Sequence, residues 1–200
     1  MFSEILALSG AAIGVIVAVA AVVVIAIIIA VVYISLKNGL IRVVNRTEES
    51  WATIDVYLKK RYDLIPNLVA TVKGYAKHES EVLEKVIAAR NTITGAKTQD
   101  ERIAAENELG KELKTFMNFT VERYPELKAN SSFMDLSSKL SGIESDLANA
   151  RKYYNANVRE YNNKIMVFPT AFIARGMKLE KKSYFELDSE AERVAPKVEF

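Results

Sequence analysis

The chain contains no cysteine and a single histidine, His78. Without cysteine it has no disulfide and no thiol chemistry, which fits a reducing compartment. One histidine excludes a two-histidine metal site and the helical H-E-x-x-H zinc motif. None of the 8 glycines forms a phosphate-binding loop, and no serine has a histidine partner for a catalytic triad. We therefore expect no catalytic residue, no metal and no cofactor.

Charge is also missing between Glu4 and Lys37, where Ala, Val, Ile, Leu and Gly form an almost unbroken apolar run. More than about 18 such residues indicate a membrane span. The run extends from Ile5 to Leu36 and would reach roughly 48 Å as a helix, more than the ~30 Å of bilayer hydrocarbon. It has no polar face of the kind that a core helix shows. We predict an anchor over residues 1–37, with the span at about 8–35.

A cleaved secretory signal is the alternative interpretation of this run. Such a signal begins with basic residues, whereas Met1–Glu4 contains no Lys or Arg. Ala18-Val19-Ala20 resembles a cleavage site, but cleavage there would leave a dozen or more apolar residues on the mature chain. A permanent anchor explains the segment better.

Basic residues are absent before the run and follow it at Lys37, Arg42 and Arg46. The positive-inside rule then predicts a single-pass protein of the cell membrane, with the N-terminus outside and the following domain in the cytoplasm. All 27 Lys and Arg, and all but one of the 25 Asp and Glu, follow the run. This near balance argues against a nucleic-acid partner.

Small residues recur every four positions within the run, at Gly10, Gly14 and Ala18. Such a face lets helix backbones approach closely in lipid, so it is a candidate site of self-association. Small residues are also common in spans that do not associate.

After the run, apolar residues keep three- and four-residue steps from Leu40 to Tyr75, which predicts a long helix. Asn38-Gly39 either breaks the helix at the membrane exit or lies within a continuous, kinked helix. Pro66 lacks a backbone donor, but the apolar phase continues across it, which favours a kink over a stop. We expect this helix to end near residues 76–78.

A second helix is predicted around residues 82–93, with Gly95 in the left-handed conformation at its end. Thr98 and Glu101 then form a T-x-x-E capping box that begins a third helix, which runs to about Arg123. The phase also permits one continuous helix here, but the glycine and the cap favour two.

Pro125 ends the third helix, and Asn130 or Ser132 caps a fourth. Apolar positions then repeat from Phe133 to Ile165 as the seam of a long, coiled-coil-like helix, which Phe168-Pro169 ends. Residues 169–200 show no period and are predicted to be an extended or disordered tail that docks locally. No stretch alternates as a strand. The predicted fold is therefore all-α, with an antiparallel helical bundle over residues 38–168.

Two polar sets are candidate partner surfaces, or hold the bundle in register. The first surrounds the proline and comprises Arg61, Tyr62, Asp63, Pro66 and Asn67. The second lies on the fourth helix and includes Tyr154, Asn157 and Tyr161. Asn157 falls on the seam, where a buried amide specifies register in coiled coils. Tyr and Arg are also frequent at interface hot spots.

Several ordered motifs resemble the LemA family of bacterial membrane proteins. They are R-Y-D-L-I-P-N-L-V at 61–69, Y-A-K-H-E at 75–79, A-E-N-E-L at 105–109, Y-P-E-L-K-A-N at 124–130, and then Arg151, Tyr153-Tyr154-Asn155, Tyr161-Asn162, Ile165 and Phe168-Pro169. The resemblance covers the chain to about residue 176. It implies an N-terminal membrane helix and a cytoplasmic bundle of four long helices, without an established enzymatic activity. Relatives are linked to magnetosome formation or lie near TPM-domain proteins. The long apolar run and Asn38-Gly39 depart from the pattern.

Together these observations favour a non-enzymatic scaffold anchored in the lipid bilayer. It would form a homo-oligomer or dock a membrane-associated partner protein, and would help organise or shape the membrane. The alternative is an adaptor that relays an envelope signal to such a partner or to a protease. No small-molecule substrate is evident.

Overall fold

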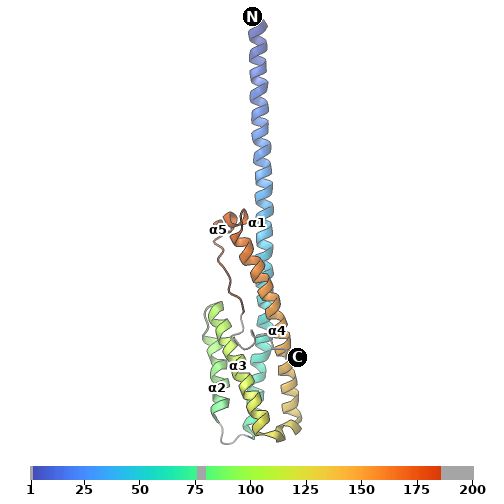
Figure 1. Cartoon of the computed structure of the whole chain (residues 1–200), viewed down its shortest axis with the longest axis vertical. Coiled ribbons are helices and arrows are strands. Elements are labelled where there is room, and N and C mark those ends of the chain that lie inside the picture. Colours follow the sequence, from blue (N-terminus) through green and yellow to red (C-terminus); the bar gives the residue numbers. More distant parts are fainter. Residues whose placement is uncertain (1, 76–79, 186–200) are drawn as a thin grey trace, which may run out of the picture. The chain divides into compact units, whose positions relative to one another are not determined.

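The computed structural model describes the backbone of residues 2–75 and 80–185, and the side chains of residues 12–75 and 81–185. Every regular element in these ranges is a helix, which confirms the predicted all-α class (Figure 1). The elements are α1 (Phe2–Lys73), α2 (Ser80–Gly95), α3 (Gln99–Arg123), the 3₁₀-helix η1 (Pro125–Ala129), α4 (Ser131–Met166) and α5 (Thr170–Gly176).

Helix α1 is continuous from the apolar run into the following domain. It passes through Asn38-Gly39 without a break, which decides between the two alternatives left open by the sequence. Pro66 also lies inside the helix, as predicted. The helix ends at Lys73, and residues 76–79, where its predicted end falls, lie outside the described ranges.

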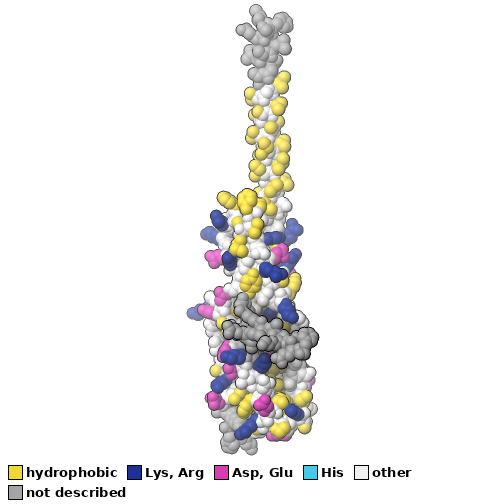
Figure 2. Space-filling model, in the orientation of Figure 1, with side chains coloured by type: hydrophobic (Ala, Val, Ile, Leu, Met, Phe, Trp, Pro, Cys, Tyr) yellow, Lys and Arg dark blue, Asp and Glu magenta, His cyan; other side chains and the backbone are white. Residues whose placement is uncertain are grey.

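The apolar part of α1 is a candidate membrane span by length and composition. Its most apolar 18-residue window has a mean hydropathy of 3.6, and none of that window is buried. On the face drawn in Figure 2, hydrophobic side chains cover this part of the helix. Such a surface is unfavourable in water and favourable in lipid.

The chain divides into two compact units that share α1 and α4. Unit 1 comprises Met1–Asn45 and Glu160–Lys181, and unit 2 comprises Arg46–Arg159 and Lys182–Phe200. Each unit has its own core. In unit 1, Leu40 of α1 packs with Ile173 and Ala174 of α5, and partly buried residues such as Leu36 and Ile165 surround them.

The core of unit 2 contains the predicted seams of the helices. The seam of α4 is buried at Phe133, Leu140, Leu147 and Tyr154, as its heptad pattern predicts. It packs in two clusters, one with the residues near Leu68 of α1 and with α2 and α3, the other with α1 residues such as Ile54 and Leu58. Figure 1 shows α2 and α3 side by side.

The connection between α2 and α3 confirms the predicted capping box and corrects the predicted glycine. The Thr98 hydroxyl accepts from the Glu101 amide, and the Glu101 carboxylate accepts from the amides of Thr98 and Lys97. The prediction of a left-handed Gly95 was wrong, because no described glycine has a positive φ. The Ala96 amide instead donates to the Ile93 carbonyl, so a tight turn closes α2.

Helix α4 begins at the cap offered by Asn130. The Asn130 side-chain oxygen accepts from the Phe133 amide at 3.0 Å, so Asn130, and not Ser132, is the N-cap. The side-chain amide of Asn130 donates to the Tyr75 hydroxyl at 3.0 Å, which joins the start of α4 to the residues after α1.

The tail differs from its prediction, because residues 170–176 form α5. Lys178 has a φ of 54° and ends this helix in a Schellman motif, where the amides of Leu179 and Lys178 donate to the carbonyls of Ala174 and Arg175. Short-range periodicity could not show a helix of two turns. The chain then extends to Phe185, which is buried in unit 2, and residues 186–200 lie outside the described part.

Replacing Thr98 with alanine should lower the stability of unit 2 by about 1 kcal/mol, because the Glu101 amide loses its acceptor at the start of α3. The control is Thr92→Ala, since the Thr92 hydroxyl only bonds the Ala88 carbonyl within α2. That variant should be neutral or slightly stabilising. Urea unfolding of the full chain in detergent measures both. Equal losses would contradict the cap's role.

Candidate functional site

A buried guanidinium joins three helices at the centre of unit 2. Arg61 of α1 has no exposed surface. It pairs with the carboxylate of Glu106 of α3 at 2.5 Å and with that of Glu144 of α4 at 3.1 Å. It also donates to the Glu106 carbonyl at 3.0 Å. These three residues are called the Arg61 network below.

The helical pattern explains why these polar groups are buried. Arg61 occupies the apolar stripe of α1 between Leu58 and Ile65, and Glu106 lies three residues after Ile103 on the stripe of α3. Both therefore face the core, where each ion needs the other. Glu106 is only 2% exposed, whereas the Glu144 side chain is 40% exposed.

Gly110 provides the space for the guanidinium. A Cβ atom at this position would come within 3.3 Å of Nη1 of Arg61, closer than most Cβ contacts. The glycine lies in the middle of α3, where it lowers helix stability relative to alanine. A close approach of Arg61 to the α3 backbone accounts for it.

A second arginine increases the positive charge of the same region. The pKa of Arg151 is lowered to about 10, first by burial and then by the charge of Arg61, while Glu144 and Glu106 act in the opposite direction. Its guanidinium carbon lies 4.2 Å from the centre of the Phe185 ring, a favourable cation–π position. Its Nε and Nη2 atoms are buried and have no hydrogen-bond partner in the described part of the chain.

The C-terminal extension is held on α4 by directed hydrogen bonds. Asn155 and the backbone of Phe185 bond in both directions, at 2.8 and 3.0 Å. The Tyr154 hydroxyl accepts from the Gln99 side chain at 2.7 Å and donates to the Ser183 carbonyl at 3.0 Å. Trp51 packs against the rings of Tyr154 and Phe185. This set, called the tail clamp below, orders a segment with no periodic signal.

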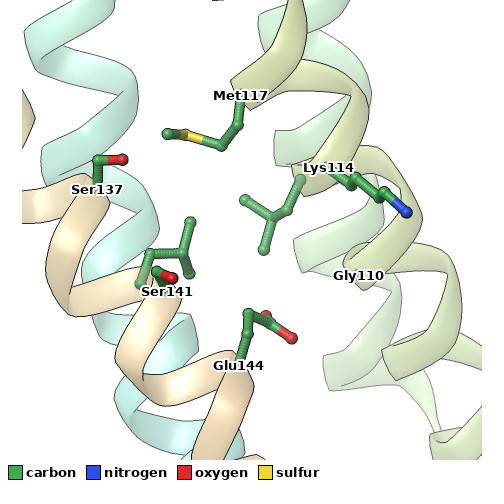
Figure 3. A pocket seen from close by; sticks show the side chains of 8 residues that line it. Gly110, Lys114, Met117, Ser137, Ser141 and Glu144 are labelled. Atoms are coloured by element: carbon green, nitrogen blue, oxygen red, sulfur yellow. The ribbon is translucent and has the colours of Figure 1, made fainter. Parts of the chain in front are cut away.

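A groove of about 400 Å³ opens between α3 and α4 beside the Arg61 network. Its lining combines apolar, small and charged residues: Gly110, Leu113, Lys114, Met117, Ser137, Leu140, Ser141 and Glu144. In Figure 3, Met117 of α3 points toward Ser137 of α4, while Lys114 points away from the groove. Ser137 and Ser141 of α4 and Gly110 of α3 are the small residues of this lining.

The residues of the two predicted polar sets lie in different environments. Arg61, Tyr154, Asn157 and Tyr161 are buried. Tyr62 is half-buried with its ring 3.7 Å from the guanidinium carbon of Arg90.

The first set is otherwise exposed, since Asp63, Pro66 and Asn67 face solvent. The structure brings Arg61 and Tyr154 into unit 2 and places Tyr161 in unit 1, where its hydroxyl donates to the Glu180 carbonyl at 2.7 Å. The amide nitrogen of Asn157 is buried without a hydrogen-bond partner in the described ranges.

Two further features singled out by the sequence are the small residues of the apolar run and the single histidine. Gly14 and Ala18 are exposed on α1, and a Cβ atom at Gly14 would meet no described atom within 4 Å. The side-chain environment of Gly10 and all of His78 lie outside the described part. Among the described residues, no group of acidic residues is placed to hold a metal ion.

Sequence reasoning missed Gly110 and Phe185, named Arg151 and Asn155 only within polar motifs, and did not place Glu106 or Glu144 in the core. A signal existed for Glu106, because it shares an apolar stripe with Ile103 and Leu109. No comparable signal marks the partners of Asn155, which are backbone atoms 30 residues away.

The described residues define an all-helical class of protein, in which one N-terminal helix is a candidate membrane span and a helical unit is centred on a buried ion network. The LemA family model matches residues 50–200, and the chain belongs to the LemA family. It is 27% identical over 166 residues to Protein LemA of Metamycoplasma hominis, which covers 82% of this chain and 74% of that protein. The sequence resemblance is thereby confirmed.

Replacing Arg61 with methionine should destabilise unit 2 by about 3–5 kcal/mol, because it leaves the Glu106 carboxylate buried and unpaired. The matched variant adds Glu106→Gln, which removes that buried charge and should recover most of the loss. Urea unfolding of the full chain in detergent gives both values. A double variant no more stable than Arg61→Met would contradict the importance of the ion pair.

Replacing Tyr154 with phenylalanine should cost about 1–2 kcal/mol at neutral pH, because the Ser183 carbonyl and the Gln99 amide lose their partner. Burial raises the pKa of Tyr154 to about 12; the Gln99 hydrogen bond opposes this, and Asp100 adds to it. The unfolded chain therefore ionises first, and the stability due to Tyr154 is lost as pH rises from about 10 to 12.

The difference in stability between wild type and Tyr154→Phe should then shrink across this pH range, as followed by urea unfolding at each pH. Arg151 contributes with the opposite sign, since its lowered pKa favours the folded chain above about pH 10, but it is present in both proteins. A difference that does not change with pH would contradict the burial of the phenol.

Proposed function

We propose that this protein is a non-enzymatic scaffold anchored in the cell membrane. One observation carries the proposal: the same continuous helix, α1, contains an exposed apolar segment and supplies Ile54, Leu58 and Arg61 to the core of unit 2. The proposed anchor and the first helix of unit 2 are thus parts of one helix, α1. Membership of the LemA family supports a shared role of this kind.

The proposed orientation has unit 2 in the cytoplasm. Lys37 and Arg42 follow the apolar segment directly, and the residues before it contain no Lys or Arg. In this orientation the scaffold acts at the cytoplasmic face of the membrane.

Two open surfaces support assembly as the mode of action. The first is the face of α1 at Gly14 and Ala18, where small residues permit close packing with the helix of a second copy in lipid. The second is the groove between α3 and α4. Copies that gather through α1 would form a homo-oligomer and help organise or shape the bilayer around them.

An adaptor is the second candidate function, and the groove favours it. The half-exposed Glu144 both lines the groove and pairs with the buried Arg61. A partner protein could place an apolar side chain against Leu113 and Met117 and a neighbouring basic side chain against the Glu144 carboxylate. Because Glu144 pairs with Arg61, a partner that contacts Glu144 would directly affect the packing of α1, α3 and α4.

Extraction of the full chain into lipid nanodiscs, followed by measurement of its stoichiometry, tests both candidates. We expect a homogeneous homo-oligomer. Gly14→Leu combined with Ala18→Leu should convert it to monomers because bulky side chains separate the helices, whereas Ala20→Leu on another face should not. A wild-type monomer with no partner would contradict the scaffold.

The groove is tested in the same preparation. Ser141→Trp should fill it and release a bound partner protein while the oligomer persists, and Ser145→Trp, outside the groove, serves as the control. A wild-type monomer that carries a partner sensitive only to Ser141→Trp would support the adaptor instead. A catalytic turnover abolished by Glu144→Gln would contradict both proposals.

A further inference from the structure

Two phenylalanines of unit 1 are exposed although the surrounding structure is ordered. Phe168 is 83% and Phe172 is 78% exposed, the highest values among the large hydrophobic residues of the described ranges. The neighbouring Met166 and Val167 are 50% and 59% exposed. Three consecutive apolar side chains, Met166, Val167 and Phe168, together with Phe172 one helical turn later, are called the α5 ridge below.

The α5 ridge is held in place by the opposite face of the helix. Ile173 and Ala174 are buried against Leu40 of α1. The Thr170 hydroxyl bonds the carbonyls of Lys164 and Val167, which shapes the turn between α4 and α5. The exposure of the two rings is thus a consequence of the fold, since the other face of α5 forms the core.

The ridge lies next to the end of the apolar segment of α1. Phe168 and Phe172 line a cleft of about 470 Å³ whose other wall is α1 from Ile28 to Lys37. Lys37 is the first charge after the apolar run. At ~1.5 Å per residue, the wall covers roughly the last 12 Å of apolar helix before that charge, so it extends over the interfacial layer and the adjoining acyl chains if α1 crosses the membrane.

The charge around the ridge is positive. Residues 12–45 and 160–181 contain six Lys and Arg against two Glu. Arg175 and Lys178, at the end of α5, are both exposed. In Figure 2, Lys and Arg side chains lie beside the hydrophobic patch at this end of unit 1. Apolar rings flanked by cations are typical of segments that lie in an interface containing anionic lipids.

We propose that the α5 ridge inserts into the interfacial layer of the bilayer that α1 crosses. Phe168 and Phe172 enter the acyl-chain boundary, lipid chains occupy the cleft against Ile28–Leu36, and anionic headgroups meet Arg175 and Lys178. The proposal rests on the anchoring proposed above and adds a second membrane contact, which fixes the depth and rotation of α1. A second copy of the chain is the competing occupant of the cleft.

Spin labels on the full chain in vesicles test this directly, because the protein has no cysteine to remove. One nitroxide is placed at each of Phe172→Cys, Ile25→Cys in the middle of the apolar segment, and Met134→Cys on unit 2. Met134 is 49% exposed and serves as the control. Power saturation with oxygen, which enters lipid, and with a nickel chelate, which stays in water, reports the depth of each label.

We expect the ratio of oxygen to nickel accessibility at Phe172→Cys to exceed that at Met134→Cys several-fold and to lie below that at Ile25→Cys. A label at Ile25→Cys in the bilayer with a label at Phe172→Cys in water would overturn the inference and leave the anchor intact. Labels in water at both positions would overturn the anchor as well. A label at Phe172→Cys that is shielded from both oxygen and the nickel chelate would show a second copy in the cleft, which also overturns it.

The headgroup part is tested by charge removal. Arg175→Gln with Lys178→Gln, in the Phe172→Cys chain, should remove any increase in label depth caused by adding phosphatidylglycerol to phosphatidylcholine vesicles. Lys139→Gln with Lys152→Gln on unit 2 should leave that increase unchanged. An increase that survives the first pair, or none in the parent chain, would contradict recognition of anionic lipid.

Discussion

The packing of unit 2 depends on one buried guanidinium. A charge without exposed surface is strongly unfavourable unless it is paired and hydrogen-bonded, so Arg61 of α1 requires Glu106 of α3 and Glu144 of α4 at the same time. This requirement specifies which faces of the three helices meet and how the helices are aligned along their axes. Apolar contacts alone specify this alignment weakly, because they are not directional. Gly110 is explained by the same requirement, since it leaves room for the guanidinium against the α3 backbone.

Two residues, Arg151 and Glu144, connect this network to the rest of unit 2. Arg151 brings a second guanidinium close to the first, and Glu106, Glu144 and the ring of Phe185 offset its charge. The last described residues are therefore part of the electrostatic balance of unit 2, held there by Asn155. On the other side, Glu144 extends the network to the groove between α3 and α4, so the buried charge pair and the open surface share one carboxylate.

Sequence reasoning succeeded where a periodic pattern and a local rule agree. The seam of α4, the capping box at Thr98 and the passage of α1 through Pro66 were all predicted from residues a few positions apart. It failed where the deciding partner is distant or the element is short: α5 has seven residues, Asn155 binds the backbone 30 positions away, and Gly95 needed no left-handed conformation because a tight turn closes α2. The sequence shows Arg61 and Glu106 as charged residues on the apolar stripes of their helices. The pairing of Arg61 with Glu106 and Glu144 is seen only in the tertiary structure.

The central claim is that the Arg61 network joins α1, α3 and α4 into one cooperative unit. Native-state hydrogen exchange on the full chain in lipid vesicles measures this most directly, because amides that open together share one free energy of opening. We predict that the amides around Arg61, Glu106 and Glu144 exchange only when all three helices open together, with one shared free energy that is the highest in the protein. Faster exchange of α3 or α4 around these residues, with α1 still protected, would contradict it.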